Sequence, residues 1–138
     1  MSTFNETITL TNVWDHINAK HGIVPQSDVR TVTLDAYVDT GAWNLVINEK
    51  TRATLGLELE GSEFSTLADG TTAEYAMAGP VEIRWENRRF ILSAQVIPTA
   101  DEILLGAFAM EALDVIADPV DECLKGRHGD KPLRRLKT

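Results

Sequence analysis

The stretch "TVTLDAYVDTGAWNLVIN", residues 31–48, decides the fold of this chain. Its two apolar runs, Thr31–Val38 and Trp43–Asn48, predict two strands that belong to a core. Between them lies Asp39-Thr40-Gly41-Ala42, so that a carboxylate follows directly on the first run. An ionised carboxylate between two buried strands is strongly disfavoured unless another group shares its proton or donates hydrogen bonds to it. The sequence therefore raises the question of which group stabilises Asp39.

The composition is that of one globular domain. The chain has 138 residues, of which 43% are hydrophobic, which is enough for a core and argues against disorder. No stretch approaches the roughly 18 apolar residues of a membrane span, and residues 1–10 lack the basic start and apolar block of a secretory signal. The single Cys123 cannot form an internal disulfide. We therefore expect a cytoplasmic protein without membrane contact.

Charge is unevenly distributed along the chain, whose net charge is −8. The segment Lys125–Thr138 holds six of the 13 Lys and Arg and one of the 21 Asp and Glu, so its charge is about +5 and that of the remainder about −13. An acidic body argues against nucleic-acid binding, which needs a basic face. We expect residues 120–138 to be a basic tail, either part of the domain or mobile.

The rest of the sequence predicts a mostly β chain. Residues 6–13 alternate like a half-buried strand, and residues 14–28 predict a loop with room for one helical turn. Asn48 and Gly56 are typical of the two ends of a short helix, and Asp69-Gly70 predicts a hairpin turn. Further strands are expected at residues 29–38, 43–47, 57–68, 71–85, 88–98 and 103–106, and short helices at residues 49–55 and 107–113.

A faint internal repeat relates two halves of the chain. The pattern Leu-x-Ala-x-Val occurs at residues 34–38 and again at residues 92–96. In both halves 21 residues separate its leucine from a second leucine, Leu55 in one case and Leu113 in the other. Each half runs strand, glycine turn, helix and short strand, although the two turn glycines are out of register. The two halves therefore share an order of structural elements more than they share identical residues.

These features resemble the retropepsin-like aspartic proteases, the single-lobed class that includes retroviral proteases and bacterial relatives. The resemblance covers residues 29–119, through Val38-Asp39-Thr40-Gly41-Ala42, "LADGTTAEY" at residues 67–75 and "ILLGAFAMEALDVIADP" at residues 103–119. It implies an all-β fold: a closed retropepsin-like barrel lobe with an internal pseudo-twofold repeat and one or two short helices. Residues 1–28 would then be an N-terminal strand and loop, 29–119 the catalytic lobe, and 120–138 the C-terminal tail.

The same resemblance implies an aspartic endopeptidase without a metal or other cofactor. In this class two carboxylates flank one water, and because two aspartates about 3 Å apart cannot both ionise, they share a proton. The chain has one Asp-Thr-Gly, and its other acids, such as Asp35, Asp69 and Asp118, lie in different settings. The second carboxylate must then be the partner's Asp39, so we expect an obligate homodimer that acts on a peptide or protein. His16 and His21 lack partners at ligand spacing, so we expect no metal site.

Other residues receive roles from the resemblance. Thr40 would hydrogen-bond across the dimer axis, while Gly41 permits a close backbone approach and Ala42 completes the turn. Leu67, Ala68, Asp69, Gly70 and Thr71 would form the tip of a flap that binds substrate as an added strand. We expect Leu104, Leu105 and Gly106 to pack against the turn and hold it rigid.

Two other functions remain open at this point. A non-catalytic retropepsin-like dimer would bind peptide segments or a partner protein without cutting them. Trp43, which either fills the core or narrows a subsite, and a flap with one tip glycine favour this function mildly, whereas the intact Asp39-Thr40-Gly41 argues against it. The other possibility is a small barrel of unrelated role in which Asp-Thr-Gly occurs by chance. Cleavage of a peptide library that is lost in Asp39→Asn would distinguish the enzyme from both.

Overall fold

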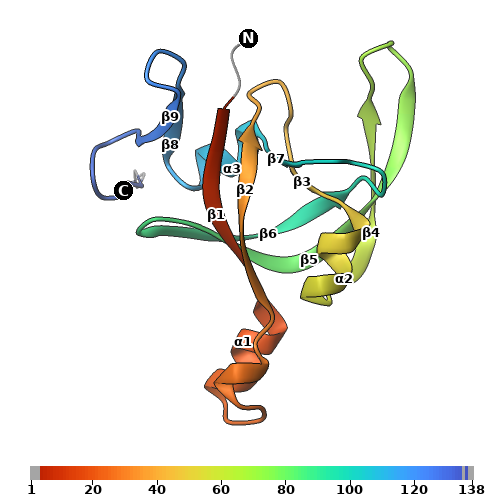
Figure 1. Ribbon diagram of the computed structural model, residues 1–138, viewed down its shortest axis with the longest axis vertical. Helices are drawn as coiled ribbons and strands as arrows, with labels where there is room; N and C mark the ends of the chain where they lie inside the picture. Colours follow the sequence, from red (N-terminus) through yellow and green to blue (C-terminus); the bar gives the residue numbers. More distant parts are fainter. Residues whose placement is uncertain (1–3, 135, 137–138) are drawn as a thin grey trace.

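The chain folds into a closed β-barrel from which one long hairpin extends (Figure 1). The computed structural model describes residues 4–134 and 136. The strands are β1 (Phe4–Asn12), β2 (Thr31–Val38), β3 (Leu45–Ile47), β4 (Glu58–Thr66), β5 (Thr72–Trp85), β6 (Arg88–Val96), β7 (Ile103–Leu105), β8 (Val115–Asp118) and β9 (Cys123–Gly126). The helices are α1 (Val13–Lys20), α2 (Glu49–Leu55), α3 (Ala107–Ala112) and the short 3-10 helix η1 (Gln26–Asp28).

Six strands close the barrel in the described part of the chain. They are hydrogen-bonded in the order β1-β2-β7-β3-β6-β5, and a further pairing of β1 with β5 completes the ring. β4 pairs with β5 in the hairpin that stands away from the barrel, and β8 and β9 form a separate antiparallel pair next to β1 (Figure 1). The predicted all-β barrel lobe is confirmed, with three α-helices among the described residues in place of the one or two expected.

The internal repeat is visible in the strand pairing. β2 runs parallel to β7, β6 runs parallel to β3, and β3 and β7 pair antiparallel between them. Shifting the numbering by 58, the difference between Leu34 and Leu92, maps β3 onto β7 and the first residue of α2 onto the first residue of α3. In this arrangement β2 of the first half pairs with β7 of the second half, and β6 of the second half pairs with β3 of the first. This exchange is the pseudo-twofold arrangement that the family resemblance implies.

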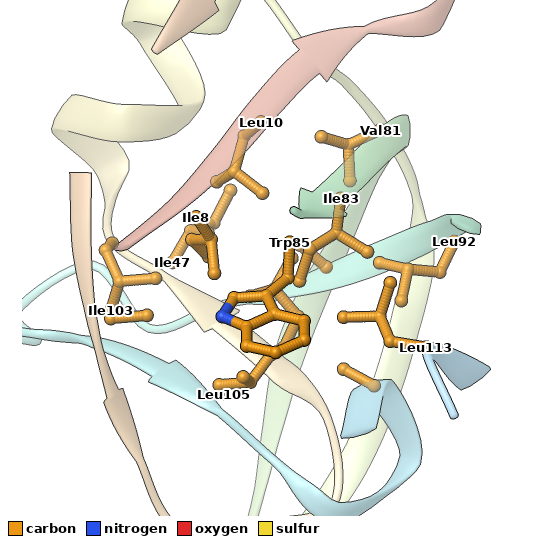
Figure 2. Close-up of a cluster of buried hydrophobic side chains, with 14 of the residues drawn as sticks. Ile8, Leu10, Ile47, Val81, Ile83, Trp85, Leu92, Ile103, Leu105 and Leu113 are labelled. Carbon is orange, nitrogen blue, oxygen red and sulfur yellow. The ribbon is translucent and has the colours of Figure 1, made fainter. Parts of the chain in front are cut away.

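Aliphatic side chains from both halves fill the barrel. Leu55 and Leu113, the equivalent leucines of the repeat, are completely or almost completely buried. Figure 2 shows the surrounding cluster, which includes Ile8, Leu10, Ile47, Val81, Ile83, Trp85, Leu92, Ile103 and Leu105. Burying one such side chain contributes about 1.5–3 kcal/mol to stability. The core therefore fixes the short central strands β3 and β7, which carry the loops of the candidate site.

Residues 14–28 are not the loop that the sequence predicts, because α1 begins directly after β1. Asn12 caps this helix: its Oδ1 accepts a hydrogen bond from the Asp15 N–H at 3.1 Å, while its Nδ2 donates to Leu55 O at 2.8 Å. α1 projects from the barrel (Figure 1), and Val13 is the residue of this helix that is buried. Its remaining side chains therefore lack the apolar period that reveals a packed helix. None of the helices in residues 4–134 has the length and apolar character needed to cross a membrane.

The basic C-terminal segment contacts the lobe as far as Arg134. The buried Arg88 of β6 donates hydrogen bonds to the carbonyl oxygens of Asp114 and Gly129. The buried Asp114 carboxylate lies 2.9 Å from His128 Nδ1 and accepts a hydrogen bond from the Leu133 N–H at 3.0 Å. Most of these partners are backbone groups, which leave no pattern in the sequence. The segment is thus held by specific polar contacts as well as by the pairing of β9 with β8.

The Asp114–His128 pair predicts an acid-sensitive contribution to stability. Hydrogen bonds from His128 and from the Leu133 N–H hold the pKa of Asp114 below its ordinary value. Since the folded pKa is lower than the unfolded one, this contribution is complete above about pH 4 and is lost as the pH falls through the folded pKa. We expect Asp114→Asn to have a lower urea midpoint than wild type at pH 7, and the gap to narrow below about pH 4.

The substitution suits the site because Asp114 has φ +57°, a left-handed conformation that asparagine tolerates. Asp130→Asn removes an exposed carboxylate from the same segment and serves as the control. A gap between Asp114→Asn and wild type that stayed constant from neutral to acidic pH would contradict this assignment.

Candidate active site

Asp39 follows β2 directly and is held by backbone groups on two sides. Its N–H donates a hydrogen bond to Leu105 O in β7 at 3.1 Å, and its Oδ1 accepts one from the Gly41 N–H at 2.9 Å. The Ala42 N–H returns to Asp39 O at 3.2 Å and closes the turn. The Gly41 N–H therefore gives the carboxylate a defined direction.

Asp39 is less buried in the structure than the sequence led us to expect. Its side chain is half-buried, and Thr40 and Gly41 are exposed. The reason is that β2 ends at Val38, so the turn lies at the surface and not inside the barrel. The face of the turn that carries Thr40 and Gly41 is consequently accessible to another molecule.

The β7–α3 junction packs directly against this turn. The Ala107 N–H donates to Ala42 O at 2.8 Å, so the first residue of α3 is bonded to the turn. A Cβ atom on Gly106 would lie 2.4 Å from Asn44 O and 2.6 Å from Trp43 O, and only glycine permits such an approach. The structure thus brings the predicted turn-packing residues together with the turn. They are Leu104, Leu105 and Gly106.

The predicted flap is the β4–β5 hairpin, and residues 67–71 form its exposed tip. The Gly70 N–H donates to Leu67 O at 2.9 Å, and Gly70 has φ +86°. Asp69 Oδ1 accepts hydrogen bonds from the hydroxyl and the N–H of Thr71 at 2.6 and 2.9 Å, which together lower the pKa of Asp69. The Asp69 carboxylate therefore stabilises the hairpin turn and lies in a different setting from Asp39.

A hollow of about 390 Å³ lies between the Asp39 turn and the hairpin. The turn contributes residues 41–44, and the hairpin contributes residues 63–67 together with Tyr75. The remaining lining residues come from the central strands and the end of β6, and they are Val46, Gln95, Ile97 and Leu104. Of the predicted flap-tip residues, Leu67 lines the hollow, whereas Ala68, Asp69, Gly70 and Thr71 lie beyond it. The two predicted parts of the site therefore face one space.

Trp43 belongs to this hollow and not to the core. Its side chain is 60% exposed, and its ring lies 5.5 Å from that of Phe108 in α3, measured between centroids. The sequence left open whether Trp43 fills the core or narrows a subsite. Its exposure excludes the first possibility, and its place in the lining fits the second.

A chain of polar side chains joins the hairpin to the turn. Gln95 of β6 is 4% exposed, donates to Ser65 Oγ at 2.6 Å and accepts from Asn44 Nδ2 at 3.3 Å. Asn44 Nδ2 also lies 3.4 Å from Glu63 Oε1. These residues leave no local pattern in the sequence, because they lie far from one another along the chain. The one available signal was a polar residue, Gln95, between two apolar ones near the end of a buried strand.

The other acidic candidates are engaged elsewhere. Asp35 accepts a hydrogen bond from Thr7 Oγ1 at 3.1 Å. Asp118 is paired with Lys125 and accepts hydrogen bonds from the backbone of the β8–β9 turn, which lowers the pKa of Asp118 to about 2. In the part of the chain that the structure describes, no three His, Cys, Asp or Glu residues gather as a metal site would require.

Comparison with known proteins gives a fold and no sequence family. No protein-family model and no curated sequence matches the chain. Among solved structures, it is similar to the retroviral protease-like domain of Ddi1 from Leishmania major, with a TM-score of 0.50 and 19% identity over 68% of this chain and 78% of that one. A retropepsin-like aspartic protease from Rickettsia conorii also matches, with a TM-score of 0.41 and 18% identity over 80% of this chain and 82% of that one. The first likeness confirms the predicted retropepsin-like fold.

Proposed function

We propose that this protein is an aspartic endopeptidase whose active site is completed by a homodimer. The observation that carries the proposal is the setting of Asp39. Its carboxylate is oriented by the Gly41 N–H, the residues that follow it in the turn, 41–44, line a hollow shared with the long hairpin, and Thr40 and Gly41 are exposed. The retropepsin-like fold supports the same activity. One subunit supplies one such acid, so a twofold axis beside the turn would supply the second.

The two Asp39 carboxylates would act as a pair that holds one proton. The ionised carboxylate takes a proton from a water molecule, whose oxygen attacks the carbonyl carbon of the scissile bond. The protonated carboxyl donates its proton to the carbonyl oxygen, which yields a tetrahedral diol. When the C–N bond breaks, the amine nitrogen takes one proton from the pair and the diol returns another to it. The pair again holds one proton, and no covalent bond to the enzyme forms.

The hollow indicates how the substrate would bind. Val46, Ile97 and Leu104 present apolar surface next to the Asp39 turn, which favours apolar side chains of an extended peptide. The hairpin β4–β5 extends past the barrel and ends in an exposed tip, so its backbone is placed to add a substrate strand. The proposed substrates are therefore extended, mainly apolar segments of peptides or proteins.

A non-catalytic dimer that binds peptide segments is the second candidate. Trp43 favours it, because an exposed indole next to the hollow is a suitable contact for a ligand. This role does not explain the oriented carboxylate of Asp39, so we prefer the enzyme.

Digestion of a mixed peptide library, with the products identified by mass spectrometry, tests the proposal. We expect cleavage within extended apolar segments and its suppression by a statine-type inhibitor, which carries a hydroxyl that mimics the tetrahedral diol. Peptides that bind to the protein and remain intact would favour the second candidate. The cytoplasmic location expected from the single Cys123 stays a prediction.

A further inference from the structure

We infer that Glu63 makes one subsite of the hollow selective for a lysine or arginine side chain of the substrate. This inference rests on the proposed endopeptidase function and narrows its substrate class. Glu63 contributes the one carboxylate among the residues that line the hollow, and no Lys or Arg of the described residues lines it. A cationic side chain of the substrate would therefore be the group that balances this charge.

The Glu63 carboxylate is directed toward the turn. Its Oε1 lies 3.4 Å from Asn44 Nδ2, and Asn44 is held in turn by the buried Gln95. None of the ion pairs among the described residues includes Glu63. Glu63 is exposed, and its contact with the neutral Asn44 amide directs the carboxylate without adding a positive charge beside it.

Other carboxylates of the same hairpin differ from Glu63. Glu60 accepts a hydrogen bond from Ser93 Oγ at 2.7 Å, and Glu74 accepts one from Ser62 Oγ at 2.7 Å. Neither residue lines the hollow. The combination of a negative charge, an orienting amide and a place in the hollow is therefore particular to Glu63 on this hairpin.

The residues that line the hollow suit a long basic side chain. Val46, Ile97 and Leu104 line the hollow with apolar groups, while Glu63 and Asn44 add polar ones. Lysine and arginine bury their methylene stems against apolar surface and keep the charged end on a polar group. A carboxylate in such a site discriminates by charge, since a glutamate side chain of the substrate would be repelled.

Matched peptides test this inference. Each peptide keeps one extended apolar sequence and carries lysine, norleucine or glutamate at a single position, which is moved along the peptide. We expect kcat/KM of the wild type to favour lysine over norleucine by roughly tenfold at one position, the scale of a charged hydrogen bond partly screened by water. In Glu63→Gln this ratio should fall toward one, and in Glu63→Lys glutamate should become preferred over lysine at that position.

Glu58→Gln is the matched control. Glu58 is an exposed carboxylate of the same strand that does not line the hollow, so this variant lowers the charge equally and should keep the preference for lysine. A wild type without that preference, or a Glu63→Gln variant that retains it, would overturn the inference while Asp39-dependent cleavage still supported the endopeptidase. If none of the peptides were cleaved by the wild type, the proposed function would fail and this inference with it.

Discussion

Asp39→Asn is expected to lower kcat/KM for peptide cleavage by roughly 10³-fold, the scale of general acid–base catalysis by a positioned group. An amide can neither take a proton from the attacking water nor share one with the facing carboxylate. The substitution should leave the fold intact, because the Asn Oδ1 can still accept the hydrogen bond that Asp39 receives from the Gly41 N–H. Peptide cleavage assays beside thermal unfolding of both proteins measure the two effects.

Asp35→Asn is the control for this variant. Asp35 lies on β2, the strand that leads into Asp39, is exposed, and accepts its hydrogen bond from Thr7. It should retain the activity of the wild type. Equal activity of Asp39→Asn and wild type would exclude Asp39 from the chemistry, and an unfolded Asp39→Asn protein would contradict the structural part of the prediction.

Gly106→Ala should lower both stability and activity, since the new Cβ would overlap the backbone of the Asp39 loop. The three closest atoms are Asn44 O, Trp43 C and Trp43 O, at 2.4 to 2.6 Å, and none of them belongs to a flexible side chain. The loop or α3 must therefore move, and we expect a loss of about 2–3 kcal/mol in the free energy of unfolding. Displacing the Asp39 turn should also reduce cleavage in conditions where the variant is still folded. Urea unfolding and peptide assays measure these losses.

Gly22→Ala separates this overlap from the general cost of replacing a glycine. Gly22 has φ +73° and no atoms within 4 Å of its would-be Cβ, and it lies after α1, away from the hollow. We expect it to cost about 1 kcal/mol, the scale of left-handed strain alone, with activity unchanged. A Gly106→Ala protein no less stable than Gly22→Ala would contradict the close packing of the turn against α3.

Local signals in the sequence were sufficient to predict several elements of the fold. α2 begins after Asn48, whose side chain accepts a hydrogen bond from the Thr51 N–H, and it ends just before Gly56, which has the left-handed conformation, as the sequence indicates. The hairpin at Asp69-Gly70 and the repeat that relates β2 to β6 were also readable, since each depends on a turn residue or on a fixed spacing. α1 could not be predicted from such local signals, because its capping residue, Asn12, lies inside a strand pattern and the outer face of the helix is solvated.

The candidate site was predictable in part for the same reason. The Asp39 turn is one run of contiguous residues with a recognisable motif, and the residues that pack against it are another such run. The polar chain from Glu63 through Asn44 to Gln95 spans three separate segments, and it exists only once the barrel brings them together. The anchoring of the C-terminal segment by Arg88 uses backbone carbonyls, which any sequence provides. Non-local polar contacts of this kind determine the parts of the site that the sequence does not reveal.

The most direct measurement of the central claim is peptide cleavage by wild-type subunits refolded together with a growing excess of Asp39→Asn subunits. If each active site needs one Asp39 from each of two subunits, a ninefold excess of the variant should leave about a tenth of the activity per wild-type subunit, because most wild-type chains then pair with an inactive one. Activity that stays proportional to the amount of wild-type chain, whatever the excess, would show that a single subunit is complete and would contradict the shared carboxylate pair.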